Sequence, residues 1–150
     1  MVLGLVVDAM HVYLDKQLRT KGRVAESFLL WLLVMSVGIG GVFAFMGHTV
    51  FADATAPSIG WPAGNTFQSE VAVANLTVGI LGILCWMRGN FWVATVIGFS
   101  VWCLGDAVVH IREIMVAENY APNNAGVTFY LAIVFPVILI ALLVYYLYAK

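Results

Sequence analysis

Four long apolar segments constrain this chain more than any other feature of its sequence. Residues 28–47 contain no charged side chain, and neither do residues 127–149. A helix of about 20 residues can cross a hydrocarbon layer of about 30 Å, and it satisfies its backbone hydrogen-bonding groups internally. The sequence therefore predicts an all-α fold, a four-helix transmembrane bundle with spans at about residues 27–47, 69–87, 91–114 and 127–149.

The composition excludes an ordinary soluble domain. Hydrophobic residues make up 63% of the chain and charged residues 10%, with a mean hydropathy of +0.97, whereas soluble domains are about half apolar and about a quarter charged. The net charge of −1 gives no reason to expect nucleic acid as a partner. We expect the lipid bilayer to be the main partner, and a single membrane domain over residues 1–150, because no polar linker separates the apolar segments.

Residues 1–22 begin with a short apolar stretch. No basic residues precede it and no small-residue cleavage site follows it, which argues against a signal peptide. One helical face collects the large apolar residues, which are Leu3, Val7, Met10, Leu14 and Leu18. Asp8 and Asp15 fall on the opposite face, so the segment is expected to form an N-terminal amphipathic interfacial helix on the membrane surface.

The distribution of Lys and Arg predicts the orientation. With four spans, one side of the membrane receives Lys16, Arg19, Lys21, Arg23, Arg88 and Lys150. Only Arg112 falls on the other side. The positive-inside rule therefore places both termini in the cytoplasm.

The third segment contains an ionisable stripe. Asp106, His110 and Glu113 are spaced i, i+4, i+7 and share one helical face. If this helix ends near Ile114, Asp106 lies about 12 Å below its end. A carboxylate at that depth is costly unless it is paired, wetted or protonated, and such residues usually face the bundle interior and serve a function.

Other segments bring polar groups to the same level, namely His48, Glu70 and Asn75. Three interpretations of the resulting cluster remain open. A zinc, iron or manganese site would use His48, Glu70, Asp106, His110 and Glu113 as ligands. However, His110-x-x-Glu113 occurs once and in reversed order compared with di-metal helical bundles, which repeat Glu-x-x-His.

The second interpretation is a buried hydrogen-bond network that only holds helices together. The third is a ligand pocket in which Asp106 or Glu113 accepts a proton with His110 as its partner. Aromatic walls for a quinone, a lipid or another small molecule would come from Trp61, Phe67, Trp102 and Tyr130.

Four short motifs resemble a known group of proteins. They are Gly60-Trp-Pro62, Phe67-Gln-Ser-Glu70, Asn75, and Leu104-Gly-Asp106 through His110. With these motifs, about residues 28–149 look like small, uncharacterised four-span prokaryotic membrane proteins that are broadly DoxX-like. The resemblance implies a compact bundle with polar motifs at its outer end, in a prokaryotic cytoplasmic membrane. It implies no established activity.

Two functions are therefore in competition. The polar Asp/Glu/His cluster at the non-cytoplasmic end could form a small-ligand or metal site. Alternatively, the chain is a non-catalytic accessory or scaffold subunit of a homo-oligomer or a larger membrane complex. No motif identifies a reaction, so the sequence does not indicate whether the chain is an enzyme. A transporter or channel fits least, because the cytoplasmic halves of the spans carry little that is polar besides Ser36 and Thr95.

Overall fold

The computed structural model describes residues 2–15 and 21–148, and the described residues form helices without any β-strand. In chain order, the elements are α1 (Val2–Leu14), α2 (Lys21–Trp31), the π-helix η2 (Leu32–Ile39), α3 (Gly40–Thr49), α4 (Ala52–Ile59), α5 (Phe67–Leu84), the 3-10 turn η3 (Cys85–Met87), α6 (Asn90–Ala117), α7 (Pro122–Ala125) and α8 (Val127–Tyr148).

Four continuous helical stretches are long and apolar enough to cross a membrane. They contain 21 to 28 residues each and are Gly22–Thr49, Phe67–Met87, Asn90–Ala117 and Pro122–Tyr148. The first combines α2, η2 and α3. The predicted all-α fold, with four long apolar helices after a short N-terminal helix, is confirmed. The assignment of the chain to a single domain stays a prediction.

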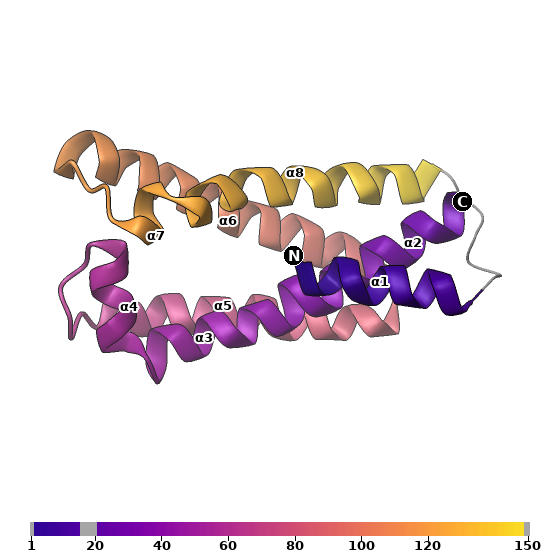
Figure 1. Ribbon diagram of the computed structural model, residues 1–150, viewed down its shortest axis with the longest axis horizontal. Helices are drawn as coiled ribbons and strands as arrows, with labels where there is room; N and C mark the ends of the chain where they lie inside the picture. The colour runs from indigo at the N-terminus through magenta and orange to yellow at the C-terminus, as the bar shows by residue number, and fades with distance from the viewer. Residues whose placement is uncertain (1, 16–20, 149–150) are drawn as a thin grey trace.

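The long helices are arranged as two pairs along the length of the molecule. Figure 1 shows α6 beside α8 along one side and α3 beside α5 along the other. The short helices α4 and α7 contact each other at one end, which we call the capped end. The start of α2 and the end of α8 lie at the other, uncapped end.

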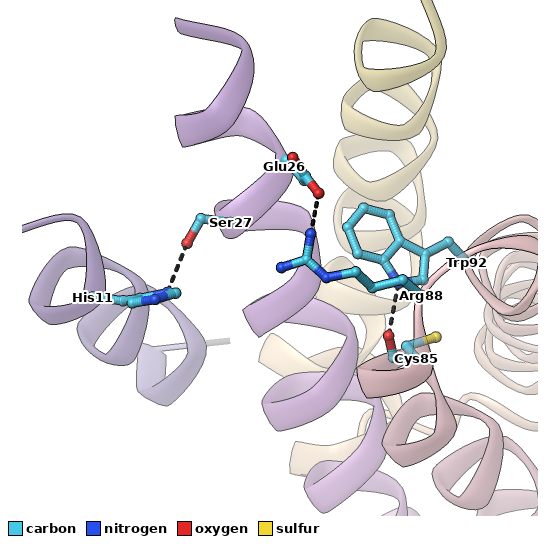
Figure 2. Close-up of polar contacts among 6 residues, drawn as sticks. All are labelled: His11, Glu26, Ser27, Cys85, Arg88 and Trp92. Carbon is cyan, nitrogen blue, oxygen red and sulfur yellow. Dashed lines mark hydrogen bonds and ion pairs between the residues drawn. The ribbon is translucent and has the colours of Figure 1, made fainter. Parts of the chain in front are cut away.

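The apolar core occupies the uncapped half of the bundle. It is built from residues of all four long helices: Leu29, Leu30, Leu32, Leu33, Val37, Cys85, Trp92, Val96, Phe135, Leu139 and Leu143. Trp92 at the start of α6 is 1% exposed, and its indole Nε1 donates a hydrogen bond to the Cys85 carbonyl over 2.8 Å (Figure 2). Lipid offers no hydrophobic drive for helix association, so van der Waals packing of these side chains is what joins the two helix pairs.

Glycines bring the first long helix and α5 into backbone contact. A Cβ atom added to Gly82 would lie 2.4 Å from the backbone nitrogen of Gly38, and one added to Gly41 would lie 2.7 Å from the Cα of Gly79. Two helices can approach this closely only where neither has a side chain. The four glycines therefore set both the distance between these helices and their rotation.

The N-terminal helix α1 lies lengthwise against α2 and η2 instead of across the end of the bundle (Figure 1). Gly4, near its start, is packed so closely that an added Cβ would lie 2.9 Å from Ser36 Oγ. Ser36 is about midway along the first long helix. The helix expected at the interface is therefore present, but it runs alongside the first long helix to about half of that helix's length.

Polar contacts explain this placement of α1. The hydroxyl of Ser27 donates to Asp8 Oδ1 over 2.5 Å, and Trp31 Nε1 donates to His11 Nδ1 over 3.0 Å. Figure 2 shows the imidazole of His11 directed toward Ser27, with 3.3 Å between His11 Nδ1 and Ser27 Oγ. The polar face of α1 is thus turned toward α2, whereas Met10 and other large apolar side chains remain exposed.

An ion pair connects the turn before α6 to α2. Arg88 Nη1 contacts Glu26 Oε1 in this pair, as Figure 2 shows. Three of the basic residues that predict the orientation, Lys16, Arg19 and Lys150, lie outside the described residues, as does the apolar Leu18. The placement of both termini in the cytoplasm stays a prediction.

The glycine contact can be tested by adding a methyl group. We expect Gly82→Ala to destabilise the protein by about 1–3 kcal/mol, because the new Cβ would collide with backbone atoms that cannot move independently. Thermal unfolding in detergent, followed by circular dichroism, measures the effect. Gly98→Ala on α6 is the matched control, since nothing lies within 4 Å of its added Cβ. Equal unfolding temperatures for the two variants would contradict this account.

The attachment of α1 should depend on pH through Asp8. Burial raises the pKa of Asp8 above its ordinary value of 3.8, outweighing the hydrogen bond from Ser27 and the nearby His11, which lower it. Folding therefore favours the protonated form, and this contribution is complete below pH 3.8 and lost as the pH rises through the raised pKa.

We expect the unfolding temperature of Asp8→Asn to fall less steeply than that of the wild type as the pH rises above 3.8, as measured by calorimetry over a pH series. Asp53→Asn, at an exposed position of α4, is the control and should retain the wild-type profile. An unchanged profile in Asp8→Asn would show that ionisation of Asp8 is not coupled to folding.

Candidate ligand site

Two adjoining cavities lie between the helix pairs in the capped half of the bundle. The first, which we call the polar chamber, has a volume of about 270 Å³. It is lined mainly by polar and aromatic residues, which are His48, Thr55, Trp61, Asn75, Trp102, Asp106, His110, Asn123 and Thr128, together with Ala44, Ile59 and Val71. It lies next to the cap, because α4, α7 and the segment after α4 contribute to its walls.

The second cavity, which we call the apolar chamber, has a volume of about 350 Å³ and extends toward the core. Its walls are mostly aliphatic, aromatic or glycine: Val37, Gly40, Gly41, Val78, Phe99, Leu131 and Phe135, with Ser36 at its deep end. Ala44, Asn75, Trp102 and Thr128 line both chambers. The combined space is therefore polar near the cap and apolar toward the middle of the bundle.

Asp106 and His110 form a pair at the polar chamber. His110 Nε2 lies 3.2 Å from Asp106 Oδ2, one helical turn away on α6. The Asp106 side chain is 43% exposed, whereas that of His110 is 9% exposed. The imidazole is thus enclosed by protein while the carboxylate remains accessible, and the pairing offsets the cost of holding a carboxylate at this depth.

Asn124 determines where the protons of this pair lie. Its Nδ2 donates to the Asn119 carbonyl over 2.7 Å, so its Oδ1 is the atom that faces His110 Nδ1 at 2.6 Å. An amide oxygen only accepts hydrogen bonds, so His110 Nδ1 carries a proton. A hydrogen bond between His110 Nε2 and the Asp106 carboxylate requires one further proton, which is bound to either His110 or Asp106. With this proton bound, the pair has no net charge.

Asn119 connects the segments of the cap by hydrogen bonds near this pair. Its Nδ2 donates to the Ile59 carbonyl at the end of α4 over 2.9 Å, and its Oδ1 accepts from the Ala121 backbone over 3.1 Å. Gly60, which follows α4, has a φ of +85° and lies directly against the Asn119 amide. A second bond, from Asn123 Nδ2 to a serine hydroxyl of α4, joins the same segments. The cap therefore positions Asn124 and, through it, His110.

His48 brings an unsatisfied polar atom to the polar chamber. Within the described part of the chain, its Nδ1 is buried without a hydrogen-bond partner. His48 and Asp106 both line this chamber. Buried polar atoms are nearly always hydrogen-bonded in native proteins, so this nitrogen marks a place where a ligand or water would bind.

The structure brings together some of the predicted site residues and separates others. His48, Asn75, Asp106 and His110 all line the polar chamber. Glu70 is exposed at the start of α5, and Glu113 is half-buried one turn beyond His110; neither lines either chamber.

The five ligands expected for a metal ion are therefore not gathered. Among residues 2–15 and 21–148, no three His, Cys, Asp or Glu side chains are grouped so that they could hold one. The physical reason is the rotation of α5. Its Asn75, Gly79 and Gly82 share the stripe that faces the first long helix, and Glu70 lies off that stripe.

A family model covers the whole chain. Residues 1–150 match the model described as a family of unknown function, DUF6790. The chain belongs to this family. No curated protein and no solved structure matches it. Membership of DUF6790, together with the four apolar helices, agrees with the expectation of a small uncharacterised membrane protein.

The sequence predicted a folded cap over residues 48–67 and placed Asn123 and Asn124 at the level of the polar cluster, but it assigned neither asparagine a role there. Asn119 read as an ordinary turn residue, because asparagine is common in turns for reasons of backbone geometry alone. The one available signal was the density of asparagine before α8, where Asn119, Asn123 and Asn124 occur within six positions. Thr55 and Thr128 gave no signal of their own.

The role of Gly60 can be tested against a second glycine of the same loop. In Gly60→Ala the new Cβ would lie 2.3 Å from Asn119 Oδ1, whose hydrogen bonds on both sides prevent it from yielding freely. Gly64 also has a positive φ, of +76°, but nothing within 4 Å, so Gly64→Ala imposes the backbone strain without the collision.

We expect Gly60→Ala to lower the unfolding temperature more than Gly64→Ala does, and to speed amide hydrogen exchange in residues 118–126, measured by mass spectrometry. Equal exchange in both variants would mean that Asn119 does not hold the cap in this way.

Proposed function

We propose that this protein binds one small amphipathic molecule between its two helix pairs. The polar group of the molecule occupies the polar chamber, and its apolar chain extends into the apolar chamber. The observation that carries the proposal is that the two chambers adjoin and share four lining residues, so that a polar and an apolar environment lie side by side. Small-molecule sites typically have volumes of about 300–1,000 Å³ and few, converging polar groups.

The unsatisfied imidazole nitrogen of His48 favours a binding function over a purely structural one. If the cluster served only to hold helices together, its members would satisfy one another, as Asp106, His110 and Asn124 do. His48 lines the polar chamber, and its Nδ1 has no partner among the described residues. A ligand with polar atoms near the cap would supply a hydrogen-bond partner to His48, and water would do so when the ligand is absent.

The location and assembly of the protein are also proposed from sequence patterns. Its membrane-spanning helices imply contact with the lipid bilayer. The positive-inside pattern supports a capped end on the non-cytoplasmic side. The motifs that resemble DoxX-like proteins support a prokaryotic cytoplasmic membrane. Assembly into a homo-oligomer or a larger membrane complex is proposed from the size of the lipid-facing surface.

The cavity can be tested with a probe and a space-filling variant. Decanol combines a hydroxyl group with an apolar chain, and we expect it to bind saturably at a single site when titrated calorimetrically into protein in nanodiscs. Ala44 lines both chambers, so Ala44→Phe should weaken binding at least about tenfold by filling their junction. Ala94→Phe, at an exposed position of α6, is the matched control.

The proposal fails if three probes with the same chain all behave as they do with empty nanodiscs. These are decanol, decyltrimethylammonium and decanoate, which have nearly the same apolar chain and head groups that are neutral, cationic and anionic. It also fails if Ala44→Phe and Ala94→Phe bind decanol equally well, because the binding would then take place at the lipid-facing surface.

A further inference from the structure

The polar chamber has a carboxylate on its wall and no permanent positive charge. Asp106 lines it, and among the described lining residues there is neither a Lys nor an Arg. Arg112 lies further along α6 and is exposed. Once the proton shared with His110 has left, an anionic head group would meet an unpaired carboxylate, whereas a cationic head group would be attracted to it.

Two indole rings line the same chamber. Trp102 lies one helical turn before Asp106 on α6, so their side chains share a face. Trp61 belongs to the loop that follows α4 and reaches the chamber from the cap. Indole faces attract cations more strongly than other aromatic side chains, and aromatic walls recognise ammonium groups in particular.

The proton between Asp106 and His110 links this charge preference to pH. With the proton bound, the pair is neutral; without it, the pair carries one negative charge. Because Asn124 keeps a proton on His110 Nδ1, the proton that can leave is the one between His110 Nε2 and the carboxylate. A cation beside Asp106 would favour its departure.

We propose that the ligand is a lipophilic organic cation, and that its binding releases the proton shared by Asp106 and His110. This inference rests on the proposed function, because it names the ligand class of the same cavity. The ammonium group contacts the Asp106 carboxylate and the two indole rings. The ligand replaces protonated His110 as the partner of Asp106. His110 becomes neutral, and one proton passes to solvent. No other covalent bond forms or breaks.

Other titratable groups lie near the pair. They are His48 on α3, and Cys103 and Glu113 on α6. The described lining residues contributed by α4, α5, α7 and α8 are not titratable. His48 is therefore the alternative proton source on a neighbouring helix that the experiment must separate from the pair.

Decyltrimethylammonium tests the proposal, since its charge does not change with pH. We expect it to bind about tenfold or more tightly than decanol near neutral pH, with decanoate binding most weakly. Its association constant should rise by up to about tenfold per pH unit while the pair is protonated. Calorimetry in two buffers of different ionisation enthalpy should show release of about one proton per bound cation.

Variants assign the effect to residues. In Asp106→Asn the preference for the cation over decanol should disappear while decanol still binds. Trp61→Leu should weaken binding of the cation several-fold without changing that of decanol. His110→Gln should retain the preference but release no proton, and His48→Gln should still release it. Glu70→Gln is the control carboxylate outside the chambers.

The outcomes separate this inference from the proposed function. If decanol binds at the site that Ala44→Phe blocks and the cation binds no more tightly, the ligand class is wrong and the cavity proposal stands. If no probe binds, both fail. A preference for the cation without proton release, or release that is lost in His48→Gln, overturns the role of the Asp106–His110 proton. The wild-type measurements decide this even where His110→Gln does not fold.

Discussion

Packing around Leu33, Trp92 and Leu139 holds the two helix pairs together, and the rest of the structure depends on where this packing occurs. All four long helices supply large apolar side chains in the uncapped half, so the pairs are in close contact there. In the other half, the first long helix presents Gly40 and Ala44 to the interior. Small residues leave space between the two helix pairs there, and the two adjoining chambers remain.

The same geometry explains how an ionisable pair is tolerated in a membrane protein. The cost of burying a charge is reduced when a partner neutralises it at short range. His110 is the partner that neutralises Asp106. Asn124, in the segment before α8, forms the second hydrogen bond of the imidazole. The carboxylate is left accessible to the chamber. The pairing with His110 lowers the free-energy cost of burying Asp106, and the same arrangement leaves its carboxylate available to a ligand.

The cap and the N-terminal helix both rely on polar contacts between segments far apart in sequence. Asn119 bonds to the end of α4, and Ser27 of α2 bonds to Asp8 of α1. Each bond satisfies groups that would otherwise be unpaired in an apolar environment. As a result, α1 turns its polar face toward the protein and its apolar face outward, the reverse of the usual arrangement in a soluble bundle.

The sequence by itself determined the class of the protein and the location of its main ionisable pair. Run length and the cost of unpaired backbone groups in lipid require long helices, and the i, i+4 spacing brings Asp106 beside His110 in any helix. Tertiary structure decided which other residues join them. Glu70 and His48 were equally eligible from their level in the bundle, but the glycine contact rotates α5 so that Glu70 faces away. Helix rotation and loop pairing depend on contacts between distant segments, and local patterns contain no information about those contacts.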